Sequence, residues 1–153
     1  METIVLSKVA YLSLIESLLE LEENHLELLD SYFPLPTQNR KAMDSLIVTY
    51  LSRMNRLLET VTADESSTVT NFPLVTIGSA VTVKELDTQT VTEFHIILPT
   101  TTHVGARDIS IFSPLGKALL LQEPNAEVEY HAPGGRFRYQ ILGIAIRCKI
   151  DAS

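Results

Sequence analysis

Residues 109–120 read ISIFSPLGKALL, a pattern that predicts a short strand followed by a capped helix. Ser113 is a suitable N-cap residue, because its hydroxyl can accept a hydrogen bond from a backbone amide of the first turn. Pro114 then stands at the first helical position, where the amide that proline lacks would have no partner within the helix. Three leucines are expected to face a sheet: Leu115, Leu119 and Leu120. The pattern therefore predicts one short helix packed on strands.

Segments rich in β-branched residues lie on both sides of this helix. They predict five strands, at about 75–86, 90–98, 108–112, 127–131 and 136–150. The Pro-Gly-Gly sequence at 133–135 predicts a turn between the last two strands, and Gly143 predicts a bulge or bend within the last one. The second half of the chain is therefore expected to be a small antiparallel sheet with one helix.

The first half of the chain has helical periodicity instead. Apolar residues at spacings of three and four predict helices at about 7–32 and 37–62. Ser7 and Thr37 are suitable N-caps, and a short connection with two prolines makes the helices antiparallel. The second helix carries a seam at the coiled-coil period, made of Met43, Ile47, Tyr50, Met54, Leu57 and Val61. The fold class is thus α+β: an N-terminal antiparallel helical hairpin, expected to be a coiled coil, followed by a small sheet.

The two predicted helices differ in charge. The first carries one lysine, Lys8, and the carboxylates Glu16, Glu20, Glu22, Glu23, Glu27 and Asp30. The second carries the cations Arg40, Lys41, Arg53 and Arg56. Exposed ion pairs contribute only tenths of a kcal/mol each, so an apolar seam must hold the hairpin together. A second apolar stripe on the first helix is made of Leu12, Ile15, Leu19, Leu26 and Leu29.

These patterns divide the chain into three parts. A helical hairpin occupies 1–63, a polar and weakly structured linker 64–74, and the sheet domain 75–153. The 153 residues are 45% hydrophobic and 20% charged, which is enough apolar material for a packed core.

Composition excludes several classes of function. The formal net charge is −7, which argues against a free-standing, sequence-specific DNA binder, because phosphate neutralisation supplies most of that affinity. No apolar run approaches the roughly 20 residues that span a bilayer, and the N-terminus lacks the basic region of a signal peptide. We therefore expect a cytoplasmic protein without membrane contact.

Residues suited to catalysis or metal binding do not form a recognisable pattern. None of the histidines, at 25, 95, 103 and 131, stands at ligand spacing from another histidine or from a cysteine. Cys148 is the single cysteine and has no visible base partner, which excludes an internal disulfide and a cysteine-only zinc site. We therefore expect no metal, no cofactor, no catalytic residue and no enzymatic activity of the chain's own.

The second half resembles the C-terminal domain of the Gre transcription factors and of the related Rnk regulators. Three segments carry the resemblance: IGSAVTV at 77–83, ISIFSPLGKALL at 109–120, and APGG at 132–135 before the last strand. It covers roughly residues 75–146. The resemblance implies an FKBP-like fold that docks at the rim of the secondary channel of bacterial RNA polymerase, while the coiled coil reaches toward the polymerase active site.

The same resemblance implies where the polymerase would be touched. It assigns contact to the helix start, at Ser113, Pro114, Leu115 and Lys117. Helix capping alone also explains Ser113, and the two roles are compatible. Two family glycines in this region are replaced, one by Leu121 and one by Asn125, and neither change is expected to disturb the fold.

The hairpin tip departs from the cleavage-stimulating members of the family. Those members carry a pair of acidic residues in the inter-helix loop, which can hold a second Mg²⁺ in the polymerase site. The loop at 31–39 has no carboxylate, and Asp30 and Asp44 lie at or beyond its edges. We therefore expect a transcription elongation regulator that acts at the secondary channel without stimulating cleavage. The tip residues Tyr32, Phe33 and Leu35 either form an interaction site or plug the end of the hairpin.

Two other functions stay open. The sheet could belong to a peptidyl-prolyl isomerase, although the chain has no tryptophan for the aromatic floor that such pockets commonly use. The chain could also be a generic interaction module that self-associates through the second apolar stripe. The oligomeric state stays open, with a monomer as one alternative.

Overall fold

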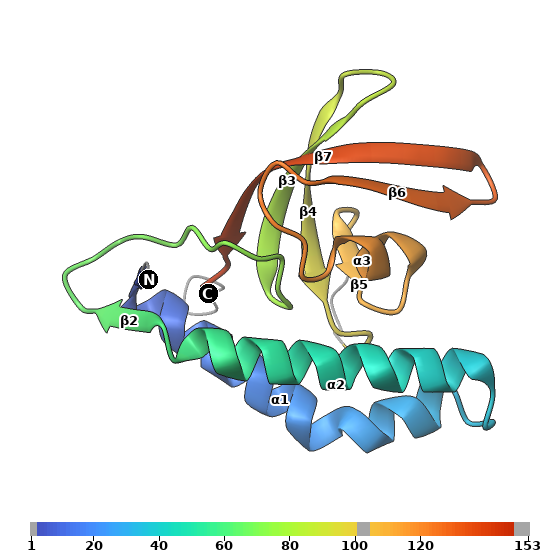
Figure 1. Cartoon of the computed structure of the whole chain (residues 1–153), viewed down its shortest axis with the longest axis horizontal. Helices are drawn as coiled ribbons and strands as arrows, with labels where there is room; N and C mark the ends of the chain where they lie inside the picture. Colours follow the sequence, from blue (N-terminus) through green and yellow to red (C-terminus); the bar gives the residue numbers. More distant parts are fainter. Residues whose placement is uncertain (1–2, 101–104, 149–153) are drawn as a thin grey trace.

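In the computed structural model, which describes residues 3–100 and 105–148, a helical hairpin lies across one end of a curled sheet (Figure 1). The hairpin consists of α1 (Lys8–Tyr32) and α2 (Gln38–Leu58). The Ser7 hydroxyl accepts a hydrogen bond from the amide of Ala10, and the Thr37 hydroxyl accepts one from the amide of Arg40. Both expected N-caps are therefore confirmed.

Helix α2 ends earlier than expected, and two short strands were missed. Beyond Leu58 the chain turns and forms β2 (Val61–Asp64), which pairs in parallel with β1 (Ile4–Ser7). The expected helix up to position 62 is therefore wrong in its last turn. Strands of four residues leave no periodicity in the sequence, and their partners are far apart along the chain, so no local pattern indicates them.

All five expected strands are present in one sheet. They are β3 (Ser79–Glu85), β4 (Val91–Ile97), β5 (Asp108–Ser110), β6 (Glu127–Ala132) and β7 (Gly135–Ile146), in the spatial order β5-β4-β3-β7-β6. Three of the expected ranges were too long, because residues 75–78, 111–112 and 147–148 lie outside the strands. Positions 149–150 lie outside the described residues.

The sheet is mixed, so the expectation of a wholly antiparallel sheet is wrong at one edge. Strand β5 pairs in parallel with β4, with Ile96 opposite Ile109. The other pairs are antiparallel. The register between β3 and β7 shifts between Thr82 and Val83, opposite Gly143, which confirms the expected bulge.

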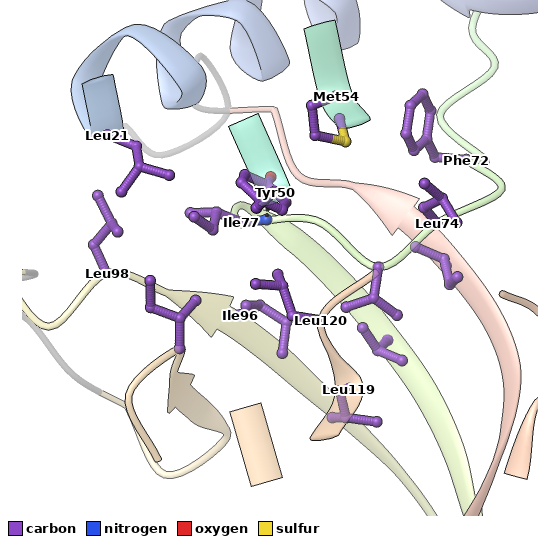
Figure 2. Packing of buried hydrophobic residues seen from close by; sticks show 14 of the residues in the cluster. Leu21, Tyr50, Met54, Phe72, Leu74, Ile77, Ile96, Leu98, Leu119 and Leu120 are labelled. Carbon is purple, nitrogen blue, oxygen red and sulfur yellow. Dashed lines mark hydrogen bonds between the residues drawn. The ribbon is translucent and has the colours of Figure 1, made fainter. Parts of the chain in front are cut away.

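One cluster of buried side chains joins the hairpin to the sheet (Figure 2). Of the expected seam on α2, Met43, Ile47, Tyr50 and Met54 are buried, whereas Leu57 and Val61 are half-buried. Phe72 and Leu74, in the segment expected as a linker, are also buried, and the amide of Phe72 donates to the carbonyl of Ile144. The three-part division of the chain and the coiled coil stay predictions.

Tyr50 links the hairpin to the sheet most directly. Its side chain is fully buried, and its hydroxyl oxygen accepts a hydrogen bond of 2.9 Å from the amide of Ile77, just before β3 (Figure 2). Burial raises the pKa of Tyr50 above its usual value, so the phenol is neutral at physiological pH. The position of the hairpin on the sheet is thus fixed by a directional contact as well as by apolar packing.

Candidate functional site

The start of α3 (Pro114–Leu119) has the local structure expected from the sequence. The Ser113 hydroxyl accepts a hydrogen bond of 3.0 Å from the amide of Gly116 and donates one of 2.7 Å to the carbonyl of Ser110. Pro114 stands at the first helical position. Because both sides of the cap are satisfied, the helix start is held in one orientation.

Gly116 allows α3 to lie close to the chain that leaves β5. A Cβ atom at this position would clash with the carbonyl oxygen of Ser110 and lie 2.8 Å from its carbonyl carbon. No larger residue fits without moving the helix. The close approach fixes the height of α3 above the sheet edge.

The four residues expected to contact the polymerase do not all lie on the surface. Pro114 and Lys117 are exposed, and Ser113 is half-buried with its hydroxyl engaged in the cap. Leu115 is only 7% exposed and packs in the core, as expected from its position facing the sheet, and its contact with the polymerase stays a prediction. The accessible part of this set is Pro114 and Lys117.

The hairpin tip packs against the start of α3. The rings of Tyr32 and Phe33 meet the ring of Phe112 edge-on, with centroids 5.5 and 5.2 Å apart. The Tyr32 hydroxyl donates to the carbonyl of Pro99 at 3.3 Å. The structure therefore brings together two sets of residues that the sequence predicted separately.

Sequence reasoning missed Phe112, the residue that joins these two sets. It is half-buried and directly precedes the cap residue Ser113. An apolar residue just before an N-cap is expected to pack on the first turns of its own helix, so no local pattern signals the contact of Phe112 with the hairpin tip.

The two interpretations of the tip, as an interaction site or as a plug of the hairpin end, both stay predictions. Phe33 is half-buried against Phe112. Leu35 is 67% exposed and Tyr32 47% exposed, so both remain available at the surface. Because Tyr32 touches Phe112 next to the α3 cap, we treat the exposed residues of the tip and of the helix start, namely Tyr32, Leu35, Pro114 and Lys117, as the candidate surface.

The carboxylates nearest the tip are already engaged. Asp30 accepts a hydrogen bond of 2.9 Å from Arg40, whose guanidinium also donates to the carbonyl of Phe33 at 2.8 Å. Asp44 lies 2.8 Å from Nε2 of His25 on the other helix. These contacts tie the loop and the two helices together. Within the described residues, no group of three or more His, Cys, Asp or Glu side chains is arranged to hold a metal ion.

Two other histidines, His95 and His131, have acidic neighbours. His95 lies between two carboxylates, with Nε2 2.8 Å from Glu93 and Nδ1 3.2 Å from Asp108. His131 is exposed beside Glu129. His103 lies outside the described residues.

An aromatic row on the last two strands was also missed. Tyr130 of β6 stacks on Phe137 and Tyr139 of β7, and Phe94 of β4 meets Tyr139 edge-on. Burial, and next the neighbouring Tyr130, raise the pKa of Tyr139 to about 12. The hairpin of β6 and β7 extends past α3 (Figure 1). The signal was the alternation of aromatic residues at positions 137 and 139.

A cavity of about 230 Å³ lies elsewhere, between α1 and the ends of β3, β4 and β7. Its walls combine apolar side chains such as Ile77 and Ile96 with Arg147 and the half-buried Cys148. It is separate from the surface at the tip and α3.

Comparison with known proteins identifies a family match for the second half of the chain. Residues 70–146 match the family described as "Transcription elongation factor, GreA/GreB, C-term". Two similar proteins are both named transcription elongation factor GreA. The one from Thermodesulfovibrio yellowstonii is 39% identical over 71 residues, which cover 46% of this chain and 45% of that protein. The one from Thermotoga neapolitana is 40% identical over 73 residues, or 48% and 47%. The chain thus spans about half the length of the curated relatives it matches.

A solved structure supports the fold of the chain as a whole. The prokaryotic transcription elongation factor GreA/GreB from Nitrosomonas europaea is similar with a TM-score of 0.50 and 22% identity, covering 95% of this chain and 99% of that one. Both chains therefore place a helical region before a curled mixed sheet. None of the helices in the described part of the chain is both long and apolar enough to span a bilayer.

Proposed function

This chain belongs to the GreA/GreB family of transcription elongation factors, and we propose that it binds bacterial RNA polymerase at the rim of the secondary channel and regulates elongation without stimulating transcript cleavage. It would not be an enzyme itself. Any change in chemistry would occur in the active site of the polymerase.

The family match over residues 70–146 carries this proposal. That range contains α3 with its rigid cap, and the exposed Pro114 and Lys117 lie at its start. The exposed Pro114 suits a docking contact, because its ring loses little freedom on binding, and Lys117 adds a positive charge one turn further on. The neighbouring Tyr32 and Leu35 would extend the contact onto the hairpin tip.

The hairpin supports the second part of the proposal. The matches to the GreA proteins cover about half of each chain, so the activity of a whole GreA protein does not transfer with them. A second Mg²⁺ needs carboxylates that are close together and available. The loop between the helices has none, Asp30 is held by Arg40, and Asp44 faces His25.

Binding to core polymerase tests the docking surface. Fluorescently labelled protein should bind core enzyme, and Lys117→Glu should weaken binding by roughly tenfold, because like charges at an interface are repulsive. Arg56→Glu on α2 makes the same change of charge at an exposed residue outside the proposed surface and should bind as the parent does. Absence of parent binding at low salt, or an equal loss in both variants, would contradict the proposal.

A transcript-cleavage assay tests the second part of the proposal, that the protein does not stimulate cleavage. Stalled, backtracked elongation complexes should cleave their RNA at the same rate with and without the protein, while the elongation rate changes. Accelerated cleavage by the parent would show that a carboxylate reaches the metal. Asp30→Asn and Asp44→Asn would then identify which one does.

A further inference from the structure

An exposed row of leucines follows the outer side of α1. Leu12, Leu19 and Leu26 are 52%, 52% and 65% exposed, although each is a large apolar residue in the middle of a helix. Leu14, Leu21 and Leu28, each two positions further on, are buried. The helix thus has an apolar side toward the core and a second apolar row directed away from it.

The spacing of the row indicates what kind of structure can cover it. Its members are seven residues apart, and a strict seven-residue repeat follows a left-handed path along a helix. A second helix crossing at about 20° stays in contact with such a path. The row extends over about 21 Å at 1.5 Å per residue, so it matches roughly four turns of a partner helix.

Negative charge borders the row. Glu22, Glu23 and Glu27 are exposed beside Leu19 and Leu26, and among the described residues none of the three has a cation within ion-pair distance. The single lysine of α1, Lys8, pairs instead with Glu65 at 2.7 Å. A partner helix would therefore meet an apolar row flanked by carboxylates.

We propose that this leucine row is the docking surface for an amphipathic helix of another protein, with apolar residues at heptad spacing and lysines or arginines flanking them. The flanking cations would face Glu22, Glu23 and Glu27, in the way that charged flanking positions select partners in coiled coils. The leucine row lies outside the family match at 70–146, and none of its three leucines belongs to the surface proposed for polymerase docking.

A second copy of this chain fits the row poorly. Two α1 helices packed on each other would bring the same carboxylates together across the contact, which is repulsive. Helix α2 of a second copy has cations, but its one exposed large apolar residue is Val48, so it has no complementary row.

A designed helix serves as the probe. A labelled three-heptad peptide with leucine at the a and d positions and lysine at e and g should bind the full chain, as measured by fluorescence anisotropy. The same peptide with glutamate at e and g should bind at least about tenfold more weakly, and added salt should weaken the lysine peptide.

Substitutions in the row locate the binding site. Leu19→Gln with Leu26→Gln removes the apolar contact and keeps a residue of similar helix propensity, so binding of the lysine peptide should fall by at least about tenfold. Val48→Gln is the matched control, because Val48 is 52% exposed on α2 and lies outside the row. Circular dichroism should show unchanged folding in both variants.

Three results would overturn the proposal. The first is no binding of the lysine peptide at high micromolar concentration. The second is binding that survives the double leucine variant, or that the Val48 variant loses to the same extent. The third is a dimer of the parent in sedimentation experiments that disappears in the leucine variant, since the occupant would then be a second copy. None of these results bears on polymerase binding, which is measured separately.

Discussion

Leu121 and Asn125 have left-handed backbone conformations, with φ of 68° and 72°. At these two positions the family that the chain resembles has glycine. Asparagine tolerates this region because its short polar side chain can bond locally, whereas leucine incurs a cost of about 1–2 kcal/mol. Leu121 keeps its place because its side chain packs on the core and its amide donates to the carbonyl of Val75 at 2.8 Å.

The hydroxyl of Tyr50 is expected to contribute measurably to stability. Tyr50→Phe would leave the amide of Ile77 buried without its acceptor, and we expect the free energy of unfolding in urea to fall by about 1–3 kcal/mol. Tyr32→Phe is the control, since that hydroxyl is in an exposed residue and makes a longer bond. Equal stability of the two variants would contradict the role assigned to Tyr50.

Tyr50 also gives the stability a defined pH dependence. Its pKa in the folded chain lies above the usual value of 10.0, and that of Tyr139 is raised to about 12. Above about pH 10 the unfolded chain releases these protons while the folded chain keeps them, so the free energy of unfolding should decrease as pH rises. Urea titrations at increasing alkaline pH should show a shallower decrease for Tyr50→Phe.

At the level of elements, features with a local sequence pattern were predicted well, whereas pairings between distant segments were not. The caps at Ser7, Thr37 and Ser113, both long helices and all five strands of the main sheet have patterns within a few residues. The β1–β2 pair and the parallel edge strand β5 depend on partners that no local pattern specifies. The end of α2 was misjudged for the same reason, because β2 competes for residues that also suit a helix.

Gly116 should be the least replaceable residue of α3. Gly116→Ala places a methyl group against the backbone of Ser110, and we expect a loss of more than about 3 kcal/mol in unfolding free energy, as for other severe backbone clashes. Gly143→Ala is the matched control, because a Cβ there meets no atom within 4 Å. Chemical denaturation of both variants checks this, and a stable Gly116→Ala protein would show that α3 can move.

At the scale of the whole molecule, the residues of the candidate site were predicted from the sequence, but their proximity in the fold was not. Pro114 and Lys117 were expected from one motif and Tyr32 and Leu35 from another, and each motif has its own local signal. Their contact is made through Phe112 and depends on how the hairpin lies on the sheet. Apolar packing between distant segments decides that arrangement, whereas the burial of Leu115 was expected from the apolar pattern of α3 alone.

Phe112→Ala should release the hairpin tip while the rest of the fold persists. Each aromatic pair contributes about 0.5–1.5 kcal/mol beyond its buried area, so amide hydrogen exchange should accelerate at the tip and at the start of α3. Phe94→Ala removes another half-buried ring with one edge-on partner, Tyr139, and should leave exchange at the tip unchanged. Acceleration spread over the whole chain in the Phe112 variant would contradict a local role.

The parallel pairing of β1 with β2 has a consequence for the order of folding. It joins segments on either side of the hairpin, as does the ion pair of Lys8 with Glu65, whose partners are 57 positions apart. Turns of α1 and α2 can form from neighbouring residues, whereas this ladder must first close a long loop, at an entropic cost that local contacts do not carry. We therefore expect the joining of its first and last segments to be the final step in folding of the N-terminal half.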